Sequence, residues 1–134
     1  FPIQVKTALQ AKISNTSQGW ILKDKHEKPI KDLIFCFVRM SLDSRDTDIY
    51  IVDSDKVAEC SKYSHQIWLK FPNSQGGKHK DTTMRMLLHD YGKIKTKKLT
   101  NWKEYLNKDE IDFIEAHPQG WLEKYKEAWH LIKA

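Results

Sequence analysis

Residues 33–40 read Leu-Ile-Phe-Cys-Phe-Val-Arg-Met, an almost unbroken apolar run that decides the fold. A strand that is covered on both faces has this pattern. A second apolar run, Ile-Tyr-Ile-Val at residues 49–52, follows a polar stretch at residues 43–48. Because the connection between the two runs is so short, we expect an antiparallel hairpin. The centre of the protein is therefore predicted to be a β-sheet.

Helical patterns dominate the chain beyond this hairpin. Over residues 55–69, apolar and small side chains recur near helical spacing, and Ser54 precedes them as a capping residue. Residues 71–80 (FPNSQGGKHK) form the clearest loop. Further helices are predicted over residues 81–91, 101–106, 107–116 and 120–134. Asn107, with Glu110 three residues on, indicates a capping box at the start of the third of these. The strands thus come first and the helices afterwards.

Residues 19–28 (GWILKDKHEK) allow two interpretations. Their length and their charged second half fit a short helix. Trp20, Ile21 and Leu22 would also suit a brief strand. Pro29 ends either element, and the residues alone leave the choice open.

The opening residues 1–9 (FPIQVKTAL) predict another strand. Apolar Ile3 and Val5 alternate with polar side chains. Gln4 and Lys6 therefore emerge on the same face, which places an amide and an ammonium group close together. The simplest interpretation is a half-exposed strand whose polar side lies in water.

Length and composition indicate one domain. The chain has 134 residues, of which 40% are hydrophobic, and this is enough for a single core. No apolar run approaches the roughly 18 residues that a membrane-spanning helix needs, and there is no signal-peptide pattern. The two cysteines lack zinc-site spacing, and Cys36 lies inside an apolar run. We therefore expect a buried free thiol and a reducing, cytoplasmic setting.

The net charge of +5 suits a polyanionic partner, although many proteins without one are also basic. The residues that could neutralise phosphates are Lys78, His79, Lys80, Arg85, Lys95, Lys97 and Lys98. The same cations would serve equally as solubilising surface charge. No two of the six histidines have the spacing that places two metal ligands on one helical face.

Trp121, Tyr125 and Trp129 recur at helical spacing in the last segment. A buried packing face is the simpler interpretation of such a stripe. A helix face that docks a partner protein is the alternative.

The order of these segments resembles a known family. The segments that carry the resemblance are Ile-Gln-Val-Lys-Thr at residues 3–7, Trp-Ile-Leu-Lys-Asp-Lys-His-Glu at 20–27, Phe-Cys-Phe-Val at 35–38, Ile-Tyr-Ile-Val-Asp-Ser at 49–54, Val57, Ala58, Trp68 and Gly-Gly-Lys-His-Lys at 76–80. Together they resemble uncharacterised bacterial proteins with the restriction-endonuclease-like, PD-(D/E)XK nuclease fold. The resemblance covers residues 3 to about 106. It implies an α/β fold in which helices flank a mixed β-sheet, with a helical C-terminal tail.

This resemblance also implies how the chain is divided. Residues 1–92 would form the nuclease-like core, and the N-terminal part of that domain would lie upstream of these residues. Residues 93–134 would form a helical extension that packs on the core. Because the family has a crossover helix after its motif strand, the resemblance favours a helix over residues 18–28.

In this family, the motif strand takes part in phosphodiester hydrolysis with Mg²⁺, a cation that prefers oxygen ligands. The resemblance implies that Gln4 and the backbone carbonyl of Val5 would bind the ion. Lys6 would orient the attacking water or stabilise the charge that develops on the phosphate. The family's essential Asp lies on the strand before the motif strand and has no counterpart here. We therefore expect that these residues alone would not cut DNA efficiently.

The function implied is thus that of an Mg²⁺-dependent DNA endonuclease-type domain, with DNA as the partner and a homodimer as one possible assembly. A non-catalytic nucleic-acid-binding domain of the same fold is the first alternative. A protein-interaction module that uses the C-terminal aromatic residues is the second. An Asp on a strand upstream of Gln4 would favour the enzyme.

Overall fold

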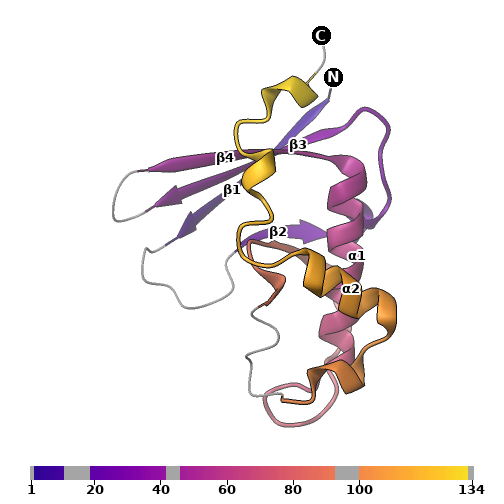
Figure 1. Cartoon of the computed structure of the whole chain (residues 1–134). Helices are drawn as coiled ribbons and strands as arrows, with labels where there is room; N and C mark the ends of the chain where they lie inside the picture. Colours follow the sequence, from indigo (N-terminus) through magenta and orange to yellow (C-terminus); the bar gives the residue numbers. More distant parts are fainter. Residues whose placement is uncertain (1, 11–18, 42–45, 93–99, 133–134) are drawn as a thin grey trace.

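The computed structural model describes residues 2–10, 19–41, 46–92 and 100–132, including the side chains of all of these except residues 9 and 10 (Figure 1). Within these ranges the protein has two β-sheets and two α-helices, together with short 3₁₀ helices. The chain is therefore a mixed α/β protein, as its sequence predicts.

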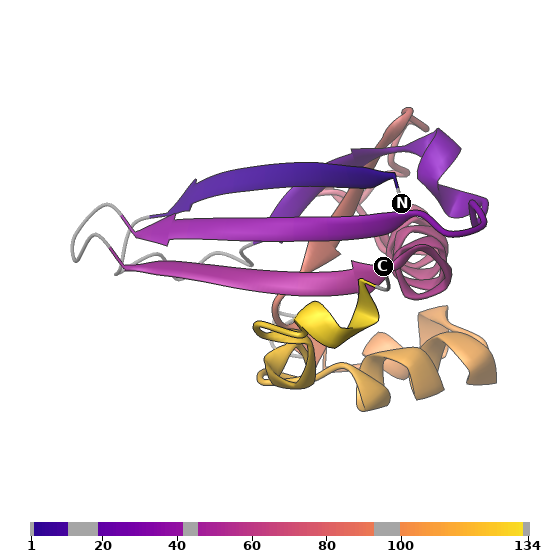
Figure 2. The ribbon, with the colours of Figure 1, turned by 90° about the horizontal axis from the view of Figure 1, so that it is seen from above.

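The larger sheet has three strands, β1 (Ile3–Gln10), β3 (Ile34–Ser41) and β4 (Thr47–Asp53), in the order β1-β3-β4. Figure 2 shows the three strands lying side by side. β1 is parallel to β3, and β3 is antiparallel to β4, with Phe37 opposite Tyr50. The predicted antiparallel hairpin is confirmed.

A smaller sheet pairs β2 (Gly19–Lys23) with β5 (Met84–Leu88) in antiparallel fashion. In β2 the buried Trp20 and Leu22 alternate with the exposed Ile21, which is the period of a strand. The strand interpretation of Trp20 to Leu22 is therefore correct, and the helix that the resemblance favoured over residues 18–28 is wrong. Only a 3₁₀ turn, η1 (Asp24–Glu27), follows β2 in the crossover from β1 to β3.

The prediction of a helix over residues 81–91 is also wrong, because residues 84–88 form β5. Met84, Leu87 and Leu88 fit a helical period, and that local pattern led to the prediction. In the structure Arg85 and Leu87 are the buried residues of this segment, which is a period of two. Pairing with the distant strand β2 outweighs the local pattern.

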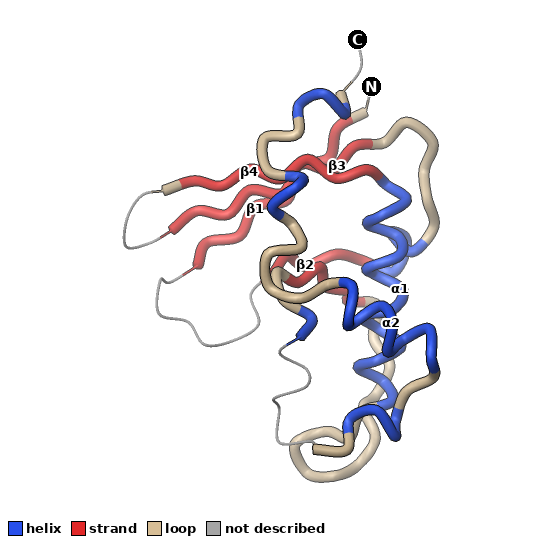
Figure 3. Tube along the Cα trace, viewed as in Figure 1, coloured by secondary structure: helices blue, strands red, loops and turns tan. Residues whose placement is uncertain are grey.

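Helix α1 (Ser54–Lys70) follows β4 directly, as expected. The capping residue is Asp53 and not Ser54 as predicted, since the Asp53 carboxylate accepts a hydrogen bond from the Lys56 amide at 3.2 Å. Figure 3 shows α1 and α2 together on one side of the strands. Val57, Cys60 and Ile67 of α1 are buried in the main core.

The helix predicted over residues 107–116 forms, whereas the short helix predicted over residues 101–106 is only a 3₁₀ turn. A 3₁₀ turn, η3 (Trp102–Tyr105), precedes α2 (Lys108–Ala116). Asn107 accepts a hydrogen bond from the Glu110 amide, and the Glu110 carboxylate accepts one from the Asn107 amide, each at 2.9 Å. This reciprocal pair is the capping box that the sequence indicates.

The prediction of a helix over residues 120–134 is wrong within the described part, where only the 3₁₀ turns η4 (Glu123–Tyr125) and η5 (Trp129–Leu131) form. Between them Lys126 forms an isolated antiparallel β-bridge with Tyr50. Glu127, whose φ is 52°, donates a hydrogen bond from its backbone amide to the Ile49 carbonyl at 2.9 Å. The edge of β4 thus supplies hydrogen bonds that a helix would have made internally.

The aromatic stripe expected on one face of that helix consequently does not form. Trp121 and Tyr125 pack against the main core, and the Trp121 indole donates to the Leu88 carbonyl at 3.0 Å. Trp129 is instead exposed.

One core links the early strands to the late helices. It contains Trp20, Phe35 and Phe37 from the strands, and Trp102, Phe113 and Leu122 from the C-terminal part. The other face of the larger sheet is covered over Ile34 and Ile51 by Ala128. Among the described residues, none of the helices combines the length and the apolar character needed to cross a membrane.

Candidate functional site

Strand β1 presents its polar side inward. Ile3 and Val5 are 48% and 59% exposed, whereas Gln4 and Lys6 are only half-exposed. Ala8, on the same side of β1 as Gln4 and Lys6, packs against the main core. The simple expectation of a polar side lying in water is therefore wrong. The motif residues do share one face, as the alternation predicts.

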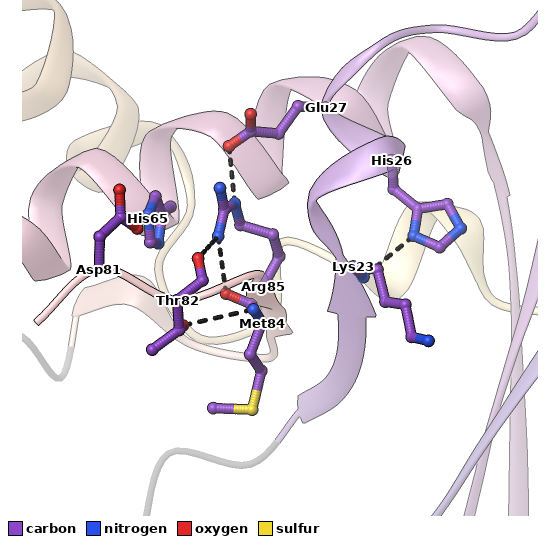
Figure 4. Close-up of polar contacts among 8 residues, drawn as sticks. All are labelled: Lys23, His26, Glu27, His65, Asp81, Thr82, Met84 and Arg85. Carbon is purple, nitrogen blue, oxygen red and sulfur yellow. Dashed lines mark hydrogen bonds and ion pairs between the residues drawn. The ribbon is translucent and has the colours of Figure 1, made fainter.

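His26 from η1 meets this face of β1. Its side chain is buried, and its Nε2 lies 3.3 Å from Oε1 of Gln4. The Nδ1 atom of the ring accepts a hydrogen bond from the backbone amide of Lys23 at 3.1 Å, which is drawn in Figure 4. Because Nδ1 is the acceptor, the ring proton lies on Nε2 and is donated to Gln4. We call Gln4, Lys6 and His26 the β1 cluster.

The β1 cluster is positively polarised. Burial lowers the pKa of His26, and the positive charges of Lys6 and Lys25 lower it further. His26 is therefore neutral at pH 7, and the ammonium of Lys6 is the full charge within the cluster. Lys6 forms no ion pair with any carboxylate in the described parts of the chain. Such a cation is available to an anionic ligand.

A second polar cluster lies on the other side of η1, where Arg85 from β5 meets Glu27. Their side chains join through Nε and Oε1 at 2.7 Å, and Nη1 of Arg85 donates to the carbonyls of Thr82 and Met84 (Figure 4). In the same view His26 points away from this pair. Arg85 is only 8% exposed. We call Glu27, Thr82 and Arg85 the β5 cluster; two of the three guanidinium nitrogens, Nε and Nη1, serve internal contacts.

The loop before β5 carries the other predicted phosphate contacts. Lys78 and Lys80 are exposed, and the His79 ring between them stacks on Trp68 with centroids 4.0 Å apart. Next in the chain, Asp81 pairs with His65 at 2.8 Å, and this hydrogen bond lowers the pKa of the Asp81 carboxyl. The remaining predicted contacts, which are Lys95, Lys97 and Lys98, lie outside the described residues.

A pocket of about 300 Å³ lies between α1 and β5. Its apolar lining consists of Ile67, Trp68, Phe71, Met84, Met86 and Leu88. Its polar lining consists of Ser64, His65, Thr82 and Arg85. The sequence does not predict this α1–β5 pocket, because Met84, Leu87 and Leu88 fit a helical period and β5 forms one wall of the pocket.

His26 was also missed as a site residue. Its partner Gln4 is distant in the sequence, and no spacing rule connects the two. The one signal in the sequence is the position of His26 just after a strand, from which a side chain can reach a neighbouring strand.

The residues that the structure describes do not suffice to hold Mg²⁺. Oxygen ligands that include carboxylates are the usual donors for this ion. Gln4 Oε1 is already hydrogen-bonded to His26, and Glu27 is paired with Arg85. Over the described ranges there is no group of three or more His, Cys, Asp or Glu that could hold a metal ion.

Comparison with models of protein families, with curated proteins and with solved structures gives no match.

Proposed function

We propose that this chain forms the phosphodiester-contacting part of a nuclease-type domain of the restriction-endonuclease-like class, acting on DNA with Mg²⁺. The observation that carries the proposal is the β1 cluster, in which the ammonium of Lys6 stands beside an amide and a neutral imidazole without a carboxylate partner among the described residues. Strand β1 is also followed by a crossover to a parallel neighbouring strand, β3.

Each residue of the β1 cluster has a role in this proposal. Lys6 places a positive charge against the phosphate, where negative charge grows during hydrolysis. His26 holds the Gln4 amide in one orientation through its Nε2 hydrogen. A bound Mg²⁺ would polarise the phosphate, and its carboxylate ligands would come from outside the described residues.

A non-catalytic nucleic-acid-binding domain is the second candidate. One observation favours it: Oε1 of Gln4, the oxygen that would face an ion, is engaged by His26. In this candidate the β1 cluster and the exposed Lys78 and Lys80 bind phosphates without cleaving them.

Cleavage of supercoiled plasmid DNA by the protein in its natural full length tests the proposal, with Mg²⁺ in one arm and EDTA in the other. We expect nicking that requires Mg²⁺ and that Lys6→Ala slows by about 100-fold or more, the cost of removing one charge-stabilising group. Lys62→Ala removes an exposed cation on α1 and is the matched control.

Two other results are informative. If Lys6→Ala cleaves as fast as the unaltered protein, Lys6 has no catalytic role. If no cleavage occurs but Lys6→Ala weakens DNA binding, the non-catalytic candidate is correct.

A further inference from the structure

The α1–β5 pocket is large enough for one ring system. Its volume of about 300 Å³ stands at the lower end of the range of roughly 300–1,000 Å³ for ligand pockets. Trp68 and Phe71 give it aromatic walls, and Met84 and Met86 add sulfur atoms that pack well against ring edges. Trp68 is 39% exposed and Met84 52% exposed, so the pocket opens to solvent.

The β5 cluster gives this pocket a polar end that donates hydrogen bonds. Nε and Nη1 of Arg85 are used internally, whereas Nη2 makes no hydrogen bond to any described residue. The Thr82 hydroxyl accepts the Met84 amide at 3.3 Å and keeps its own hydrogen to donate. Each of these groups can donate to a carbonyl oxygen on the ring edge of a ligand.

Positive charge lies next to the aromatic wall. His79 stacks on Trp68, which lines the pocket, and this contact fixes the position of the loop. Lys78 and Lys80 flank His79 and are both exposed. A ligand whose ring enters the pocket would therefore carry any attached phosphates into the neighbourhood of two lysines.

We propose that the α1–β5 pocket receives one unpaired nucleobase of a bound single strand. The ring packs between Trp68, Phe71 and the methionines, and the base carbonyls accept from Arg85 and Thr82. Lys78 and Lys80 contact the flanking phosphates. Aromatic packing of an extruded base beside a basic surface is the general means of recognising single strands. This inference rests on the nucleic-acid binding in the proposed function, and it is independent of cleavage.

Fluorescence anisotropy in EDTA tests the inference on the full chain. The probes are a short labelled oligothymidylate, an abasic strand of equal length and charge, and a duplex that contains the same strand. We expect the intact single strand to bind about tenfold more tightly than the abasic strand, as is usual for one stacked base. The duplex, whose bases are paired, should bind through its phosphates alone, so filling the pocket should leave its affinity unchanged.

Variants locate the effect in the pocket. Thr82 is exposed at the pocket, so Thr82→Phe should fill it without disturbing the core, and should reduce oligothymidylate binding to the abasic level. Thr47→Phe places the same ring at an exposed position on β4 and should change nothing. Thr82→Val removes the hydroxyl, which also accepts a hydrogen bond from the Met84 amide, and should lower the preference for oligothymidylate over the abasic strand two- to fivefold, roughly the effect of one hydrogen bond.

Several results would overturn the inference. Equal binding of intact and abasic strands, or a base preference that survives in Thr82→Phe, would exclude the pocket as a base site while leaving nucleic-acid binding intact. Free thymidine that competes for the pocket, without any advantage of the strand, would identify a nucleoside as the ligand instead. If none of the oligonucleotides binds, the nucleic-acid partner itself is wrong. A loss of cleavage alone would count against the proposed nuclease activity and not against the pocket.

Discussion

His26 and Glu27 are neighbours on η1, yet they belong to polar clusters of opposite character. Glu27 neutralises the buried guanidinium of Arg85, and two backbone carbonyls accept further hydrogen bonds from this guanidinium. His26 faces a strand whose cation, Lys6, has no carboxylate partner among the described residues. A compensated charge chiefly stabilises a fold, whereas an uncompensated one remains available to a ligand. The β5 cluster should therefore matter most to stability, and the β1 cluster most to function.

The largest expected effect is on the β5 cluster. Arg85→Ala should lower the free energy of unfolding by about 3 kcal/mol, because it removes a buried side chain and leaves the Glu27 carboxylate and the Thr82 and Met84 carbonyls without their donor. Urea denaturation followed by circular dichroism measures the loss. Arg39→Ala is the control, since Arg39 is more exposed than Arg85 and its partner Asp48 keeps a second ion pair with Lys126, so the loss should be about 1 kcal/mol or less. Equal losses in the two variants would show that the burial of Arg85 does not make its ion pair more stabilising than a surface ion pair.

A smaller effect should appear as a pH dependence of stability. The folded-state pKa of His26 is lowered, so the unfolded chain binds its proton more readily, and stability should be full above a pH of about 6.5 and decline below it. His26→Gln should reduce this decline. Denaturation midpoints of the unaltered protein and of His26→Gln, taken between neutral and mildly acidic pH, measure the decline in each. If stability declines equally in the two proteins, His26 is not held neutral on folding.

His117 should account for part of the acid-induced loss of stability that remains in His26→Gln. Its Nδ1 donates to the Phe113 carbonyl at 2.6 Å, and Nε2 faces the Lys56 ammonium at 3.3 Å. Burial lowers the pKa of His117, and the charge of Lys56 lowers it further. The double variant His26→Gln, His117→Gln should therefore have a flatter profile below a pH of about 6.5 than either single variant.

The smallest effect on stability should come from the residue that matters most to function. Lys6→Ala should change the free energy of unfolding by less than about 1 kcal/mol, since no ion pair with a described carboxylate is lost. The same denaturation experiment measures it. A loss as large as that of Arg85→Ala would make Lys6 a structural residue and would remove the distinction between the two clusters.

Local signals in the sequence were sufficient for part of the fold. The apolar run at residues 33–40 indicated a buried strand, and the Asn107–Glu110 pair indicated the start of α2. Both signals act within a few residues. The segments predicted wrongly, β5 and residues 120–132, are decided by pairing with β2 and with the edge of β4. Such partners cannot be identified from a local period.

The candidate site divides in the same way. The alternation in β1 placed Gln4 and Lys6 on one face, because the strand period alone determines this. The burial of that face, the contact with His26 and the α1–β5 pocket all depend on elements that are distant in the sequence.

The central claim is that the β1 cluster contacts the phosphodiester backbone. NMR chemical-shift mapping with a short abasic oligonucleotide tests it most directly, since this strand offers phosphates without bases. We predict shifts at the amides of Gln4 and Lys6 and at the His26 ring that disappear in Lys6→Ala, with no matching change at Arg85. Shifts confined to other surfaces, with the β1 cluster unchanged, would contradict the claim.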